Sequence, residues 1–554
     1  MRPSKSKLLF ALIITGTTIL GLNIFFCSRT RSQNFNSYGM LALPQSPLAT
    51  GQTMVDKFGQ SSLTEWPGKI HLDSELLRSA LSEEKDLNEH PGPSDRDKWG
   101  GWADGPALPS TGFFRLSKIG RKWWLVDPDG HIFFSIGIDS IDDTLTGYAT
   151  MVQDRRAMFA NLPDKSDPLS INYCLAPSSK GAGTVRAYNF YRANLQRKFG
   201  TDWQERWSEE TRTRLKSWGF NTAGIWSFGY DDSSPSTPYV VGLGASGAFN
   251  HISTGGDWWG PMPDVYDPNY LASLKTAVTN TCSTRRQDPF LIGYFVDNEP
   301  SWYGSDSNAP YGIPIGALAQ DTDVSSVKTA FLAILQTKYG TIQILNKRWK
   351  TNFSSWKALA APYGVPAAQT DDQKQDLSIL LSAYADKYFS TINDCIKSVD
   401  PNHLYLGCRF SKDAPAEVLA AAAKYCDALS FNSYAPQSDH HGWPTYSELN
   451  KPCIIGEFGA GAVDRGLFGS GMTNAGSQAG RAAYYSTYLQ TALLDPSIVG
   501  VHWFEYADEP VAGRTFDGEN YNTGIVDVTD SPYPELVAAA TSINASAYDL
   551  RYTK

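Results

Sequence analysis

Short apolar runs of strand length alternate with longer stretches of helical periodicity along most of the chain. This alternation is typical of parallel α/β folds, in which a helix follows each strand and packs on the sheet. Eight strand candidates can be counted: 132–138, 220–226, 239–243, 291–296, 403–408, 428–431, 453–455 and 499–504. Because eight such units close a barrel, the sequence predicts a (β/α)8 TIM barrel.

The length beyond a minimal barrel is expected in two long βα insertions. Residues 144–218 contain amphipathic helical sequence at 188–198 and 202–218, and residues 300–400 contain several helical stretches, including 327–338. Both insertions follow strand ends, so both should rise over the face where barrel enzymes keep their chemistry.

The first 33 residues differ from the rest of the chain. Arg2, Lys5 and Lys7 precede an uncharged run at 8–27, which is typical of a signal peptide or an N-terminal membrane anchor. The run is about 20 residues long, near the length that spans a bilayer, and no Ala-x-Ala cleavage site follows it. Cleavage and anchoring both stay open, and either predicts a protein that is secreted, periplasmic or tethered to the outside of the cell membrane.

Residues 34–110 are rich in Ser, Pro, Gly and charge, with one helical stretch near 73–84. They predict a short N-terminal extension that wraps a domain. From residue 111 onward alternating runs and turns begin, and we assign 111–546 to one catalytic domain.

Composition narrows the choice of partner. The 554-residue chain is 42% hydrophobic with a net charge of −9, and its basic residues are scattered, which argues against disorder and against a nucleic-acid partner. Aromatic residues make up 13% of the chain, and such side chains can stack on sugar rings. The cysteines lack zinc-type spacing, and His440-His441 is a weak metal signal, so neither a metal nor a cofactor is expected.

Two glutamates end buried strands. Glu299 closes the segment 291–300, where an apolar run stops at Asp-Asn-Glu-Pro, and Glu457 follows the apolar run 453–455 between two glycines. By count these are strands 4 and 7, whose ends face each other across a barrel mouth. Glycoside hydrolysis needs such a pair, one carboxylic acid to protonate the departing oxygen and one carboxylate to attack the anomeric carbon. A nucleophile-elbow serine hydrolase has little support, because Gly244-Ala245-Ser246-Gly247-Ala248 lacks the final glycine.

The chain resembles glycoside hydrolase clan A, in which an Asn-Glu pair after strand 4 carries the general acid/base and a Glu after strand 7 is the nucleophile. Asn298-Glu299 and Glu457 match that pattern. Within the clan the chain looks most like the family 50 β-agarases, on the motifs at 100–102 (Gly-Gly-Trp), 111–115, 122–131, 295–299 and 502–508. The resemblance spans roughly 96–530, although the N-terminal extension is shorter than the carbohydrate-binding-like domain that many family 50 agarases carry.

This resemblance implies a retaining enzyme that cleaves β-linked galactose-containing polysaccharide or oligosaccharide, agarose above all. Asn298 would bind the sugar 2-hydroxyl, Tyr434 would orient the nucleophile, and Trp503 would form a floor for the sugar. Further side chains lie at or just beyond strand ends, within reach of a ligand: Asp139, Trp226, Trp302, Arg409 and Glu505.

Two other functions stay open. Another clan A β-glycosidase, such as a β-galactosidase or a β-glycanase, would use the same two glutamates with a different pocket. A non-catalytic sugar-binding barrel would show aromatic platforms without a matched carboxylate pair, and the presence of both glutamates argues against it.

Overall fold

The structure is a computed structural model that describes residues 53–178, 183–228, 236–305, 308–411, 414–436 and 450–553. The predicted N-terminal targeting segment and His440-His441 lie outside the described residues. Among the helices that the structure describes, none has the length and apolar character needed to cross a bilayer.

The central element is a barrel of eight parallel strands. The strands are β4 (Ser135–Ile138), β8 (Thr222–Ala223), β9 (Tyr239–Leu243), β12 (Leu291–Val296), β13 (Leu404–Tyr405), β14 (Leu429–Asn432), β15 (Cys453–Phe458) and β16 (Ile498–Trp503). They are hydrogen-bonded in the order β13-β12-β9-β8-β4-β16-β15-β14. β16 pairs with β4, and a parallel bridge between Phe410 and Phe431 joins the chain after β13 to β14, so the ring closes. The predicted (β/α)8 barrel is confirmed.

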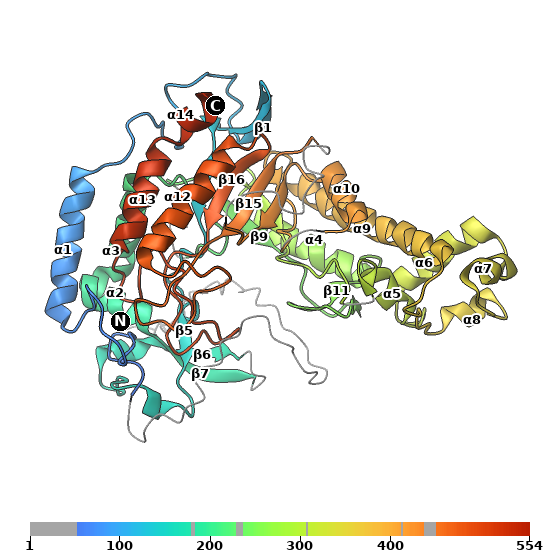
Figure 1. Ribbon diagram of the computed structural model, residues 1–554, viewed down its shortest axis with the longest axis horizontal. Helices are drawn as coiled ribbons and strands as arrows, with labels where there is room; N and C mark the ends of the chain where they lie inside the picture. Colours follow the sequence, from blue (N-terminus) through green and yellow to red (C-terminus); the bar gives the residue numbers. More distant parts are fainter. Residues whose placement is uncertain are drawn as a thin grey trace, which may run out of the picture. The chain divides into compact units, whose positions relative to one another are not determined.

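Helices cover the outside of the strands (Figure 1). They include α2 (Phe190–Phe199), α3 (Trp203–Ser217), α4 (Pro268–Cys282), α9 (Asp371–Val399), α10 (Ala416–Tyr425), α12 (Gln478–Leu494), α13 (Pro534–Ala545) and α14 (Ala547–Thr553). One large cluster of buried side chains fills the space between these helices and the strands. This packing holds the strand ends in fixed positions.

A small antiparallel sheet precedes the barrel, formed by β1 (Arg115–Ile119), β2 (Lys122–Val126) and β3 (Ile132–Phe133). Phe114, Leu125 and Phe133 share a second buried cluster with Ile292 and Val499 of the barrel strands. The predicted strand 132–138 is therefore two elements, because β3 pairs with β2 whereas β4 joins the barrel. The amino end of the barrel is packed, which leaves the carboxyl end for a site.

The first insertion contains a sheet that the sequence did not predict, in the order β5 (Ala149–Met151), β7 (Thr184–Asn189), β6 (Tyr173–Pro177). The helix expected from residue 188 begins at Phe190 instead. Tyr188 pairs with Thr150 in the sheet, and the Asn189 side chain caps the helix by accepting a hydrogen bond from the Arg192 amide.

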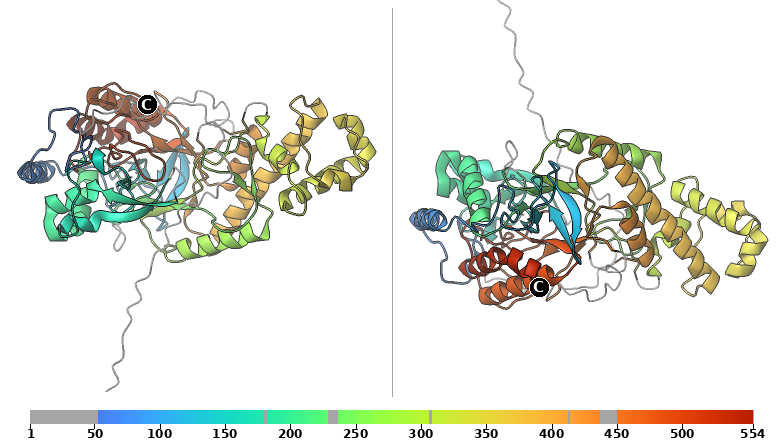
Figure 2. Two further views of the ribbon diagram at one scale, coloured as in Figure 1. Left: turned by 90° about the horizontal axis from the view of Figure 1, so that it is seen from below. Right: turned by 90° about the horizontal axis from the view of Figure 1, so that it is seen from above.

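The second insertion is mainly helical: α5 (Gly312–Leu318), α6 (Ser326–Tyr339), α7 (Ile342–Trp349) and α8 (Trp356–Ala360) lead into α9. It follows a short two-stranded sheet of β10 (His251–Ile252) and β11 (Met262–Pro263) together with α4 and β12. Figure 2 shows α6–α8, in yellow, beside the barrel and joined to it through the long helix α9.

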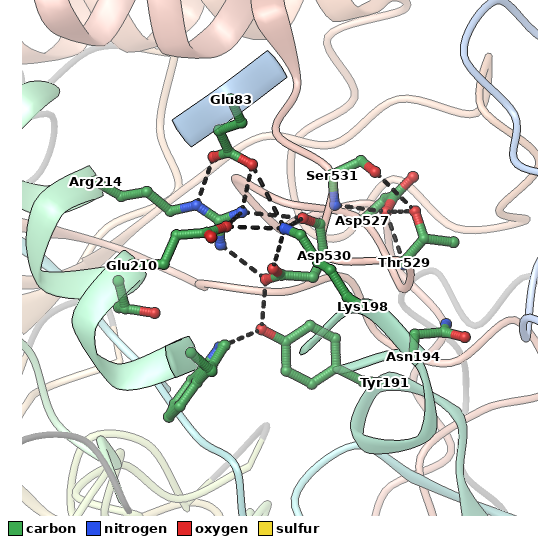
Figure 3. A network of polar contacts seen from close by, with 12 residues as sticks. Glu83, Tyr191, Asn194, Lys198, Glu210, Arg214, Asp527, Thr529, Asp530 and Ser531 are labelled. Atoms are coloured by element: carbon green, nitrogen blue, oxygen red, sulfur yellow. Dashed lines mark hydrogen bonds and ion pairs between the residues drawn. The ribbon is translucent and has the colours of Figure 1, made fainter. Parts of the chain in front are cut away.

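The N-terminal extension packs against the first insertion through α1 (Asp73–Glu89). Glu83 of α1 accepts hydrogen bonds from Arg214 at 2.6 and 2.8 Å, and Arg214 and Lys198 both contact the fully buried Asp530, as Figure 3 shows. This buried ionic network joins the extension, α2, α3 and the loop after β16.

Candidate active site

Glu299 and Glu457 lie at the carboxyl ends of the fourth and seventh strands of the barrel. Glu457 sits in the last residues of β15, and Glu299 follows β12. The backbone φ angles of Asp297 and Glu299 are 60° and 49°, a region that non-glycine residues adopt at a cost in energy. Hydrogen bonds from their amides to the Leu243 and Arg409 carbonyls, at 2.8 and 3.0 Å, hold this conformation.

The Glu457 carboxylate is buried, with only 5% of the residue exposed. One oxygen accepts a hydrogen bond from Arg409 Nη2 at 2.5 Å, and the other accepts one from the Tyr434 hydroxyl at 2.6 Å. One donor is a permanent cation, and together the two stabilise the negative charge of the carboxylate while fixing its orientation.

Glu299 has a different environment. It is half-buried; its Oε1 accepts a hydrogen bond from Asn432 Nδ2 at 3.0 Å, and its Oε2 accepts one from Trp259 Nε1 at 2.8 Å. Burial, and then the charge of Glu457, raise the pKa of Glu299 to about 7. A carboxyl with this pKa is partly protonated at neutral pH, as a general acid must be.

Arg409 connects the two glutamates to the neighbouring groups. Its guanidinium is fully buried, its Nε donates to Asn298 Oδ1 at 2.8 Å, and its Nη1 donates to the Gly456 carbonyl at 3.0 Å. The Trp226 ring lies 5.0 Å from the guanidinium carbon, which is a cation–π distance. Asn298 Oδ1 also accepts a hydrogen bond from Asn432 Nδ2 at 3.3 Å.

Asp139 supplies a second buried carboxylate beside Arg409 Nη2, at 3.1 Å. Burial outweighs the attraction of Arg409 and raises the pKa of Asp139 to about 8. Burial also lowers the pKa of the adjacent His502 to about 3, so that imidazole is neutral over the working range of most enzymes. Asp139 contacts Arg409 directly, His502 lies behind Asp139 at 3.7 Å, and both side chains are fully buried.

Five expected ligand contacts need correction. Asp139 and Arg409 are fully buried, and Arg409 binds Glu457 from inside the protein. Trp503 is fully buried and donates its Nε1–H to the Thr523 carbonyl at 2.9 Å, so its ring has no face for a sugar. Trp302, 2% exposed, stacks on Phe389, and Glu505, 1% exposed, faces Arg514 at 3.3 Å. All lie at or just after strand ends. Trp503 and Trp302 nevertheless pack on aromatic side chains of the helices, which strand position alone does not reveal.

Two residues at the site were not among the expected ones. Asn432 ends β14, in the same Phe-Asn-Ser-Tyr segment that contains Tyr434, so its strand-end position was a usable signal. Trp259 lies in a glycine-rich loop between β10 and β11, next to Trp258, and the two residues are 45% and 66% exposed. Adjacent exposed tryptophans after a barrel strand are an available sign of a sugar-binding rim.

Open space adjoins the nucleophile side of the site. A small pocket of about 50 Å³ is lined by Tyr434, Gly459, Phe504, Glu519, Tyr521 and neighbouring residues. Phe504 also meets the half-buried Trp226 edge to face, with ring centroids 6.2 Å apart. The pocket reaches the site through Tyr434, whose hydroxyl donates to Glu457, so its aromatic lining lies beside one of the two glutamates.

The chain is similar to known glycoside hydrolases. A family model described as "Beta-galactosidase" matches residues 265–452. β-Agarase B of Vibrio sp. (strain JT0107) is 38% identical over 568 residues, which cover 97% of this chain and 59% of that protein. The chain thus spans little more than half the length of this curated relative.

Two solved structures are similar over more of their length. One, of an exo-β-agarase, has 39% sequence identity and a TM-score of 0.86, with 90% of this chain and 73% of that chain covered. The crystal structure of an agarase, AgWH50C, has 37% identity and a TM-score of 0.84, with 90% and 74% covered. The chain therefore belongs to the glycoside hydrolase family that contains these β-agarases.

Proposed function

We propose that the protein is a retaining β-agarase that cleaves agarose by double displacement, with Glu299 as general acid/base and Glu457 as nucleophile. The observation that carries the proposal is the contrast between the two carboxyls. Glu299 has a pKa raised to about 7, whereas Glu457 accepts hydrogen bonds from Arg409 and Tyr434. Agarases among the similar proteins supply the substrate class.

In the first step a Glu457 oxygen attacks the anomeric carbon, and Glu299 gives its proton to the departing glycosidic oxygen. The resulting ester removes the negative charge of Glu457, the second-largest cause of the raised Glu299 pKa. Glu299 then becomes a better-ionised base, takes a proton from water, and the water oxygen displaces Glu457 with net retention.

Asn298 serves the same reaction through its amide. Because its Oδ1 accepts hydrogen bonds from Arg409 and Asn432, the amide is oriented with Nδ2 as the group that can donate to the sugar 2-hydroxyl. Such a hydrogen bond strengthens as positive charge develops on the ring.

We assign the protein to family 50 of clan A on its sequence motifs, with 34–110 as the extension and 111–546 as the catalytic domain. Its substrate is external and polymeric, which accords with export through the N-terminal segment to a secreted, periplasmic or membrane-anchored location.

A β-galactosidase is the second candidate, favoured by the family-model match over 265–452. The test is to incubate the purified protein with agarose, porphyran, galactan, mannan and a small β-galactoside, and to size the products. Oligosaccharides from agarose are expected. Galactose released only from the small substrate would favour the second candidate, and no product from any galactose-containing substrate would overturn both.

A further inference from the structure

A second cluster of polar side chains lies in the small sheet that precedes the barrel. Asp127 and His131 bracket the turn between β2 and β3, and Asp97 lies in the extension just before Gly100 and Gly101. Among the described residues these three form a group whose donor atoms all lie within 4.8 Å of one another. The proposed reaction uses none of them.

Both carboxylates are held rigidly through one oxygen. Asp127 Oδ1 accepts hydrogen bonds from three backbone amides of its own turn, at 2.8–3.0 Å. Asp97 Oδ1 accepts two from the amides of its own loop, at 2.8 and 2.9 Å. Each side chain is thereby oriented by the backbone with its second oxygen directed at a shared point, as outer-shell hydrogen bonds do for metal ligands.

The second oxygens lack an equivalent set of donors. Asp97 Oδ2 lies 2.9 Å from His131 Nδ1, and Asp127 Oδ2 lies 3.8 Å from the same nitrogen. Asp127 is fully buried, yet its Oδ2 has no hydrogen-bond partner. A Cβ at position 101 would come within 2.2 Å of that oxygen, so Gly101 keeps the space beside it open.

The neighbouring lysine, Lys98, does not neutralise these carboxylates. Lys98 pairs with Asp129 at 2.8 Å on the surface of the same turn. A buried carboxylate oxygen without a donor is costly, and a cation bound between it and its neighbours removes that cost.

We propose that Asp97, Asp127 and His131 bind a structural Zn²⁺ ion that ties the N-terminal extension to the β2–β3 turn. Two carboxylate oxygens and one imidazole nitrogen suit zinc, with bonds of about 2.0–2.2 Å and water as the fourth ligand. Ca²⁺ and Mg²⁺ fit less well because they prefer oxygen ligands alone. The side chains of His131 and Asp97 are 26% and 11% exposed, which gives the ion a route from solvent.

This site is independent of the proposed function, because it lies in the sheet that closes the amino end of the barrel. The test uses the full protein, stripped with a chelator and dialysed, and follows Zn²⁺ binding by calorimetry and the unfolding temperature by scanning calorimetry. Asp127→Asn and His131→Ala each remove one ligand. Asp129→Asn is the matched control, because it makes the same charge change in the same turn outside the cluster.

One Zn²⁺ per chain is expected to bind to the wild type and to Asp129→Asn, and to raise the unfolding temperature by roughly 3 °C. Both effects should be lost in Asp127→Asn and in His131→Ala. Two ligand variants are used so that one misfolded protein does not remove the test. A wild type that binds no zinc, or ligand variants that bind it as the wild type does, would overturn the proposal.

Discussion

Two residues of one type have opposite environments at this site. Glu299 accepts hydrogen bonds from two neutral donors, Asn432 and Trp259, whereas Glu457 accepts one from the Arg409 cation. Replacing either glutamate should therefore give a different kinetic result, although the sequence change is the same.

Glu457→Ala should abolish turnover, and azide should restore it with inverted product, because the small anion takes the place of the nucleophile. Glu299→Ala should lose about 10²–10⁴-fold on agarose but retain activity on aryl glycosides with good leaving groups, which need no protonation. Steady-state kinetics and product anomer analysis check both, with the exposed Glu205→Ala as control. Full agarose activity in either glutamate variant would refute the assignment.

Trp259→Phe should move the basic limb of the kcat/KM profile to higher pH. The hydrogen bond from its indole lowers the pKa of Glu299, so removing the donor raises that pKa above about 7 and keeps the acid protonated longer. A pH series on agaro-oligosaccharide measures the limb. Trp258→Phe, which leaves the Trp259 donor in place, should keep the basic limb at its wild-type pH. A basic limb that stays at that pH, or moves to lower pH, in Trp259→Phe would contradict the role of Trp259 as a donor to Glu299.

Strand position was enough to predict that Glu299, Glu457, Arg409 and Tyr434 lie close together, because carboxyl ends of parallel strands meet at one face. Strand position did not predict the direction of the Trp503 side chain. A residue at a strand end can point into the mouth or outward into the helix layer, and local twist decides which. Trp503 points outward and packs on Phe458.

At the scale of the element, several strands of the barrel end in an unusual backbone conformation. Ser140, Trp226, Asp297, Glu299 and Arg409 all have φ between 46° and 60° just beyond their strands. Glycine would be the residue expected there, so these turns could not be predicted from the residue types. Their cost, of order 1–3 kcal/mol each, accords with strain stored at functional sites.

The extension is held to the barrel by the ionic network around Asp530. Burial alone would raise the pKa of Asp530, but Arg214 and Lys198 outweigh it and lower that pKa to about 2. A lowered carboxyl pKa contributes stability that is present above the unfolded value near 4 and is lost as the pH falls towards 2.

Asp530→Asn should therefore destabilise the protein by about 3–5 kcal/mol at pH 7, since it removes the fully buried carboxylate that Arg214 and Lys198 share. Between pH 4 and pH 2 the variant should lose less stability than the wild type does. Urea unfolding at several pH values measures both effects. Asp549→Asn removes the same charge from an exposed position and should change little; equal acid sensitivity in Asp530→Asn and wild type would contradict this account.

For the whole molecule, the eight-strand count predicted the barrel correctly because hydrophobic runs of strand length report burial on both faces. The three-stranded sheet in the first insertion escaped prediction. Its strands are only a few residues long, and exposed and buried positions alternate just at the start of β7, which is too short a run to distinguish a strand from a helix.

Deleting residues 53–90 should lower the unfolding temperature of the whole protein while leaving kcat/KM of the folded fraction near wild type. Met54 and Val55 pack with Phe159 and Phe190, and Glu83 would no longer offset Arg214. Scanning calorimetry and an agarose assay on the soluble monomer check this. An unchanged unfolding temperature would show that the extension does not stabilise the barrel.

Gly456 has a consequence for how the protein can vary. A Cβ at this position would lie 2.7 Å from Arg409 Nη1 and 3.0 Å from Asn432 Oδ1, so any side chain displaces the guanidinium that holds the nucleophile. In a saturation library selected for growth on agarose, position 456 should accept glycine alone. Position 456 therefore cannot accept substitutions, although glycine has no side chain that takes part in the reaction. A search for new substrate specificity should instead vary the tryptophan-containing loop at 255–260.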